Sequence, residues 1–304
     1  MGREVITSAQ NPKIKELLAL QEKSRLRREK GLFVVEGRRE LEHCLNAGFR
    51  IRTVFVCPEI LPIGDLFPDQ SPLCAFGLRP HPSQTEVWAP PVHEATGGYG
   101  LERETDPAKV SVIEVSRAVY EKIAYREGTE GIVAEVYAKG RRLEDLRLSD
   151  RPLVVVLEAV EKPGNLGAVL RSADAAGADA VIVCDPATDL YNPNLIRASI
   201  GSVFTRQIAV CSSEEAIGWL KARGIRIYTA QLQDSEWYYD TDMTDGTAIV
   251  MGTEATGLTD IWRQAADAHI RIPMLGQLDS LNVSVSAAIL LFEAVRQRNS
   301  ATRK

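Results

Sequence analysis

The stretch LVVVLEAV, at residues 153–160, is the feature that most restricts how this chain can fold. It is apolar at every position except Glu158. A nearly continuous apolar run of this length is typical of a parallel strand buried on both faces, whereas a strand with one solvated face alternates. Parallel strands need long crossover connections, which are usually helices. The run therefore predicts an α/β sheet in this half of the chain.

The residues after this run fit such a sheet. In EKPGNLGAVLRSADAAG (161–177), Pro163-Gly164-Asn165 is typical of a helix start. Residues expected to face a core recur at helical spacing: Leu166, Val169, Leu170, Ala173 and Gly177. Further strands are predicted at 180–185, 225–231 and 247–252, with helices near 192–200, 213–223 and 258–266. We expect an open sheet that binds ligands beyond the carboxyl ends of its strands.

The first half of the chain predicts a second α/β arrangement. Residues 5–20 should form a leading loop and a helix, with Asn11 as the cap and Pro12 at the first helical position. A strand at 32–37, a helix at 38–48 closed by Gly48 and a strand at 52–56 form a compact β-α-β unit. The pattern resumes with a strand at 110–116, a helix near 117–125 and a strand at 131–137. Prolines crowd residues 57–100 and predict irregular structure there, and the polar segment 138–152 is the expected domain boundary.

Charge is divided unevenly along the chain. The net charge is −5, but residues 1–52 hold 12 Lys and Arg against 7 Asp and Glu, a net of +5, which leaves −10 for the remainder. A basic N-terminal segment followed by an acidic remainder favours a nucleic-acid contact at residues 1–52. Five of the cations lie in KSRLRREK (23–30). That segment is either a solvated helix face or a phosphate-binding patch.

Composition disfavours several other classes. No apolar run approaches the ~18 residues of a membrane span, and the N-terminal residues lack the apolar core of a signal peptide. Five scattered cysteines and four histidines show neither a disulfide framework nor metal-ligand spacing. The G-x-G-x-x-G and G-x-x-x-x-G-K-[ST] patterns are missing, so a conventional dinucleotide or P-loop site is not expected. We expect a cytoplasmic protein without a structural metal.

One arginine stands apart on the helix that follows Asn165. At 100° per residue, Arg171 lies off the apolar stripe, among the small residues Ala168, Ser172 and Ala175. An ordinary surface arginine is the simplest interpretation. The alternative is a functional arginine on a face that a ligand can approach closely.

Three loops at expected strand ends have unusual compositions: EKPGNLG (161–167), GTEATGL (252–258) and the start of IPMLGQLDSLNVSVSAAILLFEAVRQR (272–298). In the third, Ser280 is a good helix cap, which leaves Asn282 unexplained. In order, NLGAVLRSADAAG, VMGTEATGL and IPMLGQLDSLNVSVSAAILLFEAVRQR resemble the three motifs of the SpoU–TrmH family of RNA ribose 2′-O-methyltransferases. The resemblance covers about residues 152–298, and YNPNLIRASIGSVF (191–204) is similar to the segment that joins the first two motifs.

The N-terminal stretches ITSAQNPKIKELLAL and RREKGLFVVEGRRELEHCL resemble the L30e-like RNA-binding extension of the same family. The resemblance implies an L30e-like α/β domain over 1–145, followed by an α/β methyltransferase domain over 150–304 with a deep trefoil knot. Such knots are exceptions to a general rule. It also implies S-adenosylmethionine as cofactor and a homodimer formed through the knot domain. Ribosomal RNA is the expected substrate, and transfer RNA is the alternative.

The resemblance also implies roles for individual residues. Arg171, six residues after Asn165, would stabilise the charge that develops on the ribose 2′-oxygen, because a guanidinium holds its protons too firmly to be an ordinary base. Whether Arg171 also assists deprotonation stays open. Asn165 would fix the first motif loop and the ribose, and Glu254 would hold the second motif loop or position Arg171. Ser280 and Asn282 would shape the reaction pocket. The remaining expected contacts are Ala230, Gly252, Ile272, Met274 and Leu281 for the cofactor, and Arg25, Arg27, Arg28 and Arg197 for RNA.

Two other functions fit parts of this pattern. One is a non-catalytic RNA-binding protein with a degenerate knot, and the other is an enzyme of the wider knotted superfamily that methylates a base nitrogen. The motif positions are filled, which disfavours the first. The SLNVSVSAAI signature (280–289) favours ribose over base methylation.

Overall fold

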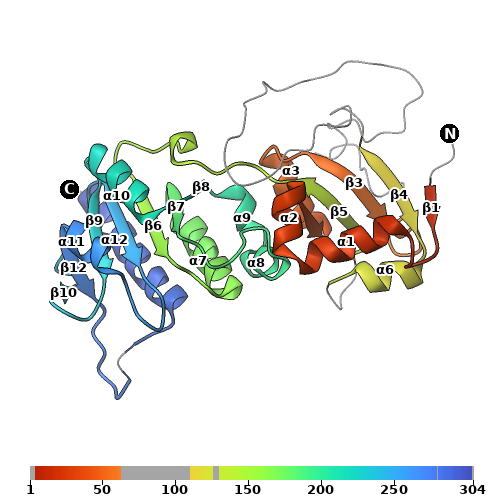
Figure 1. The fold of residues 1–304 in the computed structure, drawn as a ribbon. Helices are drawn as coiled ribbons and strands as arrows, with labels where there is room; N and C mark the ends of the chain where they lie inside the picture. Colours follow the sequence, from red (N-terminus) through yellow and green to blue (C-terminus); the bar gives the residue numbers. More distant parts are fainter. Residues whose placement is uncertain (1–3, 63–109, 126–129, 279, 303–304) are drawn as a thin grey trace. The chain divides into compact units, whose positions relative to one another are not determined.

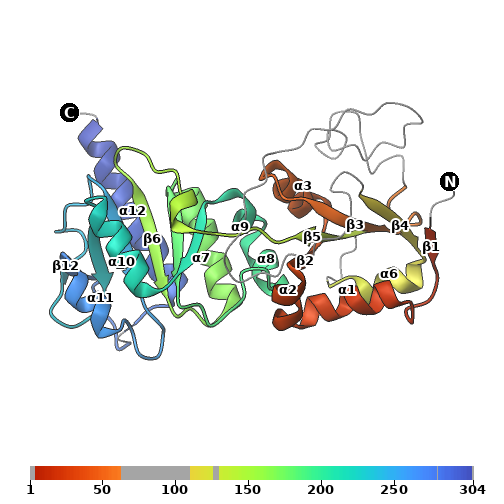
Figure 2. The ribbon, with the colours of Figure 1, turned by 45° about the horizontal axis from the view of Figure 1, so that its top comes forward.

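The computed structural model describes residues 4–62, 110–125, 130–278 and 280–302, so most of the proline-rich stretch 57–100 lies outside the described residues. The chain divides into two compact units, one made of 1–140 with 191–193 and the other of 141–190 with 194–304. Each unit has its own sheet (Figures 1 and 2). None of the helices in the described part of the chain is long and apolar enough to cross a membrane.

The first unit contains a five-stranded sheet. Its strands, in spatial order, are β1 (Glu4–Ile6), β4 (Ser111–Val115), β3 (Ile51–Val56), β5 (Ile132–Tyr137) and β2 (Leu32–Glu36). The helices of this unit are α1 (Pro12–Glu22), α2 (Ser24–Lys30), α3 (Arg38–Asn46) and α6 (Arg117–Ile123). Apolar residues of α1 and α6, such as Leu17 and Tyr120, are buried together against one face of the sheet. As predicted, Asn11 caps α1 by accepting a bond of 2.9 Å from the Lys13 amide, with Pro12 at the first position.

Two predictions for this unit are wrong in detail. β2 and β3 were expected to form a compact β-α-β unit, but β5 lies between them and pairs antiparallel with both. Residues 4–6, expected in a loop, form β1 and pair in parallel with β4. In both cases the strand partner comes from more than 75 residues away, and local pattern carries no information about such a partner.

The second unit contains a seven-stranded parallel sheet. In spatial order its strands are β10 (Glu236–Trp237), β12 (Ala268–Arg271), β9 (Arg226–Ala230), β11 (Thr247–Met251), β6 (Leu153–Glu158), β7 (Ala180–Cys184) and β8 (Ile208–Cys211). The apolar run at 153–158 is β6, an interior strand whose residues are all buried, as predicted. β8, β10 and β12 were not predicted, because each holds four residues or fewer and β10 and β12 carry charged side chains.

Helices cover both faces of this sheet (Figures 1 and 2). Trp219 of α10 (Ser213–Ala222) and Trp262 of α11 (Asp260–Ala265) pack on the face that Val154 and Ile182 present. α7 (Pro163–Ala175) and α12 (Val283–Thr302) contact each other, and they contact β7 and β11 respectively. Two short helices, α8 (Pro193–Ser199) and α9 (Ser202–Thr205), follow β7.

α7 faces the core through the residues that its periodicity predicts. Leu166, Val169, Leu170 and Ala173 are all buried. Gly177 is exposed instead, because α7 ends before it and its φ of +65° takes the chain out of the helix. Gly167, inside the helix, lies close to α8: a Cβ there would be 2.6 Å from Ala198 Cβ and 2.9 Å from Ser199 N.

This contact makes Gly167 a stability determinant. We expect Gly167→Ala to lower the free energy of unfolding by about 1–3 kcal/mol, because the added methyl group must displace α8. The matched control is Gly164→Ala in the same helix, where a Cβ has no neighbour within 4 Å. Replacing a flexible residue without strain should raise stability there by about 0.4–1 kcal/mol. Urea unfolding measures both, and equal stabilities of the two variants would contradict the close packing.

Candidate functional site

The three unusual loops lie at one edge of the second sheet. The loop 159–162 follows β6, the loop 252–259 follows β11, and residues 272–282 follow β12. All of these strands are parallel, so their carboxyl ends meet at the same edge. That edge is where open α/β sheets bind ligands.

Glu254 joins the three loops. Its Oε1 accepts a hydrogen bond of 2.8 Å from Asn165 Nδ2 and one of 2.9 Å from Asn282 Nδ2. Asn282 Nδ2 also lies 3.2 Å from Asn165 Oδ1, and Lys162 Nζ forms an ion pair with Glu254 Oε2. The structure therefore brings together three of the predicted site residues, Asn165, Glu254 and Asn282, and adds Lys162. We call these four residues the Glu254 junction.

The junction fixes the charge of its carboxylate. The hydrogen bond from Lys162 holds the pKa of Glu254 below its ordinary value of 4.5, and the bond from Asn165 acts in the same direction. In turn, the hydrogen bond to Glu254 raises the pKa of Lys162. Glu254 is thus an anion whose two oxygens already accept hydrogen bonds. Such a carboxylate is better suited to holding the loops together than to accepting a proton. Its side-chain partners within the described residues do not include Arg171, so of its two expected roles the geometry favours holding the loops.

The loop that carries Glu254 is a tight hairpin. Thr253 and Gly257 exchange two backbone hydrogen bonds of 3.1 Å, and the Thr253 hydroxyl accepts from the Thr256 amide at 3.0 Å. A Cβ on Gly252 would lie 2.2 Å from the Gly257 carbonyl carbon. Gly252 was expected to give a ligand room. The structure shows that the loop's own backbone already occupies the space beside it.

Asn282, rather than Ser280, caps α12. Asn282 Oδ1 accepts a 2.9 Å bond from the Ser284 amide, and helix α12 starts at Val283. Ser280, the predicted cap, lies three residues before the first residue of the helix. Asn282 therefore has two tasks, because its amide oxygen caps the helix while its amide nitrogen reaches the Glu254 junction. That double use explains an asparagine where a serine would suffice as a cap.

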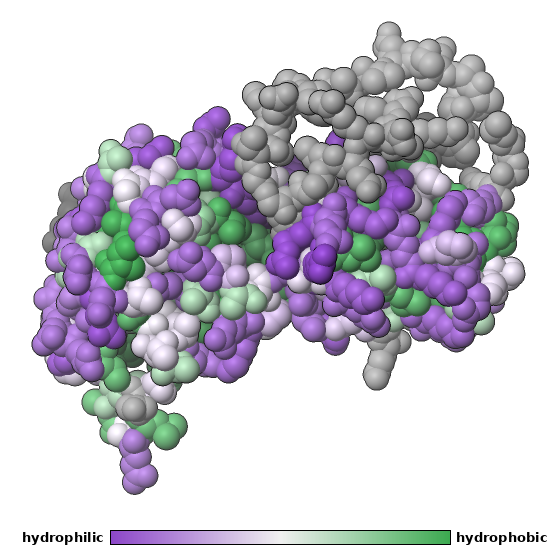
Figure 3. Space-filling model, viewed as in Figure 1, coloured by the Kyte–Doolittle hydropathy of each residue, from purple (hydrophilic) through white to green (hydrophobic). Residues whose placement is uncertain are grey.

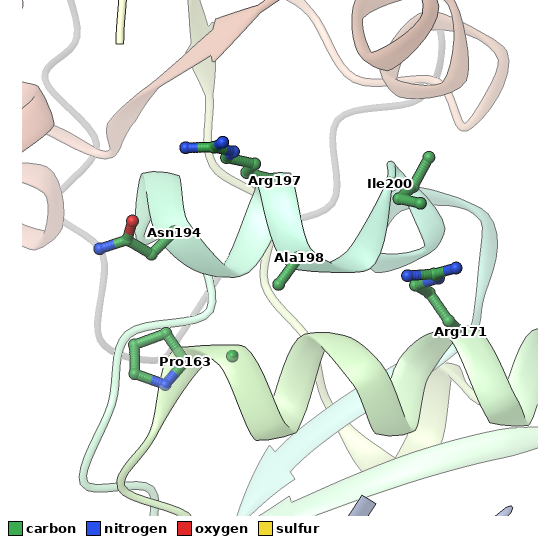
Figure 4. Close-up of a pocket in the computed structure, with 7 residues that line it drawn as sticks. Pro163, Arg171, Asn194, Arg197, Ala198 and Ile200 are labelled. Carbon is green, nitrogen blue, oxygen red and sulfur yellow. The ribbon is translucent and has the colours of Figure 1, made fainter. Parts of the chain in front are cut away.

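Arg171 lies apart from the junction, in a pocket between α7 and α8. The pocket has a volume of about 550 Å³ and is lined by Pro163, Gly164, Arg171, Asn194, Arg197, Ala198 and Ile200. Figure 4 shows Arg171 rising from α7 toward Ile200, while Arg197 projects from α8 on the side away from α7. Both arginines are exposed. Both residues line the pocket, but only the Arg171 side chain lies on the α7 side of α8. Its planar guanidinium donors suit a phosphate or a developing oxyanion.

The expected cofactor residues lie at the ends of adjacent strands. Ala230 ends β9 and pairs with Ile270 of β12, two residues before Ile272, and Gly252 follows β11 on the other side of β9. Ile272 and Met274 are half-buried, and Leu281 is exposed. Residues 275–278 lie in the projecting part of this loop, which shows apolar atoms beside a hydrophilic end in Figure 3, and Leu275 and Leu278 are 97% and 76% exposed.

The basic segment 23–30 forms helix α2 in the first unit, and the structure corrects one of its predicted roles. Arg25 and Arg28 are exposed, and Arg25 pairs with Glu29. Arg27 is only 1% exposed, and its Nη1 donates to the carbonyl oxygens of Leu20 and Gln21. Arg27 therefore joins the end of α1 to α2 and is not available to a phosphate.

Sequence reasoning missed Lys162 and Gln231. Lys162 stands directly before the Pro163 helix start, and a cation at a strand end beside a motif carboxylate was the available signal. Gln231 follows Ala230 at the end of β9. Its Oε1 is buried and has no hydrogen-bond partner within the described residues, which no sequence pattern indicates.

Comparison with known proteins gives consistent matches. The SpoU rRNA Methylase family matches residues 152–292, and the MRM3-like substrate binding domain matches residues 11–75. The chain is 30% identical, over 96% of its length and 92% of the relative's, to the 23S rRNA (uridine(2479)-2′-O)-methyltransferase of Streptomyces viridochromogenes. The crystal structure of an RNA 2′-O ribose methyltransferase is similar at a TM-score of 0.73 and 36% identity, covering 97% of this chain and 99% of that one. An AdoMet-bound rRNA methyltransferase from Sinorhizobium meliloti has a TM-score of 0.76 and 29% identity, covering 96% and 97%.

The lowered pKa of Glu254 predicts a pH dependence. A carboxylate whose pKa is lower in the folded than in the unfolded state contributes stability above the unfolded value, and this is lost as the pH falls through the folded value. We expect the free energy of unfolding, measured with urea between about pH 3 and pH 6, to fall more steeply below 4.5 in the wild type than in Glu254→Gln. Lys162→Met should flatten the profile in the same way, because Lys162 is the largest cause of the shift. Superimposable profiles for all three proteins would contradict the assigned hydrogen bonds.

Proposed function

Because the chain belongs to the SpoU rRNA methylase family, we propose that it transfers the methyl group of S-adenosylmethionine to a ribose 2′-hydroxyl of ribosomal RNA. The observation that carries this proposal is the Glu254 junction, where side chains from the first and third motif loops meet the carboxylate of the second. An intact junction also argues against a degenerate, non-catalytic domain. The relative that acts on 23S rRNA and the AdoMet-bound neighbour support the substrate and the cofactor.

The finer assignments of the fold belong to this proposal. Residues 150–304 form the methyltransferase domain with a trefoil knot, and residues 1–145 form an L30e-like RNA-binding domain. In support of the knot, β12 lies beyond β9, yet α12 returns across the sheet to contact α7 and β11. In support of the RNA-binding domain, the substrate-binding match covers residues 11–75. A structure of the full chain determined by crystallography tests both.

The ends of β9, β11 and β12 fit S-adenosylmethionine. Ala230 ends β9, and Gly252 and Ile272 directly follow the neighbouring strands β11 and β12. Met274 and Leu281, which follow in the third motif loop, add apolar side chains. The buried Gln231 Oε1 is an acceptor that an amino group of the cofactor can satisfy. When bound, the cofactor supplies an electrophilic methyl group. The residues of this edge hold it and exclude water.

Arg171 serves the attacking oxygen. A ribose hydroxyl is a weak nucleophile at neutral pH, so the negative charge that develops on its oxygen must be stabilised. Arg171 and Arg197 line one pocket, and we assign Arg171 to the 2′-oxygen and its neighbouring phosphate and Arg197 to a second phosphate. Asn165 orients the ribose, and Glu254 and Asn282 hold the Asn165 side chain. We assign Ser280 to the shape of the reaction pocket.

One experiment decides the reaction class. Purified protein, labelled cofactor and ribosomal RNA are incubated, and the RNA is digested to nucleosides. The expected product is a 2′-O-methylnucleoside. Three other results would contradict the proposal. A base-methylated nucleoside would indicate a base methyltransferase, and label found only in transfer RNA would indicate a tRNA enzyme. No transfer although the cofactor binds would indicate a non-catalytic RNA-binding protein. Mapping ribose methylation in RNA from cells that lack the protein then identifies the nucleotide.

We also propose a homodimer through α12. Val285 and Phe292 are seven residues apart, so they lie on one face of the helix, and they are 47% and 48% exposed. Exposed apolar side chains that share one face of a helix favour an interface at that face.

For Arg171, we expect Arg171→Ala to lower the single-turnover rate of methyl transfer by roughly 10²- to 10³-fold, the loss typical of one oxyanion donor. Cofactor affinity and folding should stay near wild type, because the side chain is exposed. Rescue by Arg171→Lys would indicate that charge suffices, and no rescue would indicate that the planar fork is needed. A wild-type rate in Arg171→Ala would indicate that Arg171 is an ordinary surface arginine with no part in the reaction.

For the basic helix, we expect Arg25→Glu with Arg28→Glu to weaken RNA binding and to flatten its log–log salt dependence by roughly 0.7–0.9 per lost phosphate contact. The control carries the same charge change on α6, as Arg117→Glu with Lys122→Glu, where both side chains are exposed. Filter binding between low and high salt measures both slopes. Equal slopes for the two double variants would show that α2 is only a solvated face.

For the dimer, we expect light scattering to give twice the chain mass at micromolar concentration and Phe292→Glu to give the monomer, because a buried unpaired charge is strongly unfavourable. Lys221→Glu on α10, which covers the other face of the sheet, is the control and should leave the dimer intact. A monomeric wild type would contradict the interface.

A further inference from the structure

Glu158 is the charged residue inside the apolar run that forms β6, and it is buried. Its side chain is only 4% exposed, at the carboxyl end of the strand. Oε1 accepts a 2.5 Å bond from the Thr259 hydroxyl, and Oε2 accepts a 2.9 Å bond from the Thr259 amide. A buried carboxylate is unfavourable unless its oxygens are hydrogen-bonded. Glu158 therefore needs Thr259 in one position.

Thr259 lies two residues after Gly257, the last residue of the hairpin that carries Glu254. Leu258 beside it is 3% exposed and lies in the core with Trp262, and the hairpin itself is closed between Thr253 and Gly257. The loop is therefore short, internally bonded and anchored at its exit. A shift of Thr259 moves the whole hairpin, and with it the carboxylate that holds Asn165 and Asn282.

Glu158 is also the last residue of β6, where the first motif loop leaves the sheet. Ala159 adopts a φ of +50°, which is unusual for a residue with a side chain, and its amide donates to the Cys184 carbonyl at 2.9 Å. The chain then reaches Lys162 and Asn165 within six residues. Glu158 thus directly precedes the first motif loop, and its side chain bonds to Thr259, the residue after the second motif loop.

We propose that Glu158 is a positioning residue for the reaction: through Thr259 it sets the place of the Glu254 hairpin, and so the alignment of Asn165 and Asn282. Its effect on turnover rests on the proposed function, whereas its effect on the hairpin does not. Glu158 also lies near one side chain outside the hairpin, at the start of α10. Ser213, at the start of α10, donates its hydroxyl to Asp185 Oδ2 at 2.7 Å and lies 3.4 Å from Glu158 Oε1.

The experiment compares two acid-to-amide changes in the full-length protein. Glu158→Gln replaces one of the two acceptors that face Thr259, and Asp185→Asn makes the same change one strand away without touching the hairpin. Amide hydrogen exchange of residues 253–257 is the first readout, because it needs neither RNA nor cofactor. We expect exchange to speed up at least about 10-fold in Glu158→Gln and to stay within about 2-fold of wild type in Asp185→Asn.

Single-turnover methyl transfer at saturating cofactor is the second readout. We expect Glu158→Gln to slow transfer by about 10- to 100-fold, the range that misplacement of a positioning group produces. In the double variant with Glu254→Gln, the rate should fall little below that of Glu254→Gln alone, because both changes act through one carboxylate. Thr259→Val removes the hydroxyl donor and carries the same test if Glu158→Gln does not fold.

Two results would overturn the proposal. One is wild-type hairpin exchange and turnover in Glu158→Gln and in Thr259→Val. The other is full additivity of the Glu158→Gln and Glu254→Gln effects on transfer, which would give Glu158 a general role in stability alone. If the wild type transfers no methyl group to RNA, the proposed function fails, and hydrogen exchange still decides whether Glu158 positions the hairpin.

Discussion

A carboxylate that accepts hydrogen bonds from two amides is the interaction on which the candidate site depends. Asn165 lies in the first turn of α7 and Asn282 caps α12, and the side chains of both donate to the carboxylate of the loop that follows β11. Glu254 can accept both bonds because a carboxylate has two oxygens and several acceptor positions. Lys162 neutralises the same group and keeps its pKa low, so the carboxylate keeps its acceptors across the physiological range.

This arrangement separates rigidity from reactivity. The Glu254 junction uses up its own hydrogen-bonding groups and fixes the loops. Arg171 and Arg197, in contrast, are exposed residues of an adjoining pocket, and the Arg171 side chain extends from α7 beside α8. Preorganised donors beside a fixed frame are what stabilisation of developing charge requires. The close contact of Gly167 with α8 places the two walls of that pocket on packed helices rather than on loops.

The sequence allowed prediction wherever local chemistry decides the structure. The apolar run at 153–160, the Asn11 cap and the buried face of α7 follow from period, charge and capping, and the structure confirms them. Prediction failed where a distant partner decides. Arg27 looked like its exposed neighbours, but packing of α2 beside the end of α1 buries it. Asn282 looked like a second polar residue beside the cap, because its real role depends on Glu254, 28 residues earlier. The short strands β8 and β12 have too few residues for a periodic signal and exist because a neighbouring strand pairs with them.

The separation of the junction residues along the chain has a consequence for how the protein is made. Asn165 and Asn282 are 117 residues apart, and Glu254 lies between them. At a synthesis rate of about 5–20 residues per second, Asn282 is made roughly 6 to 23 seconds after Asn165. During that interval β6 and β7 can pair, but the edge that should receive β9, β11 and β12 is open. Incomplete chains released from the ribosome would therefore carry the exposed arginines of α2 and of α7 without the Glu254 junction, which forms only when translation is nearly complete.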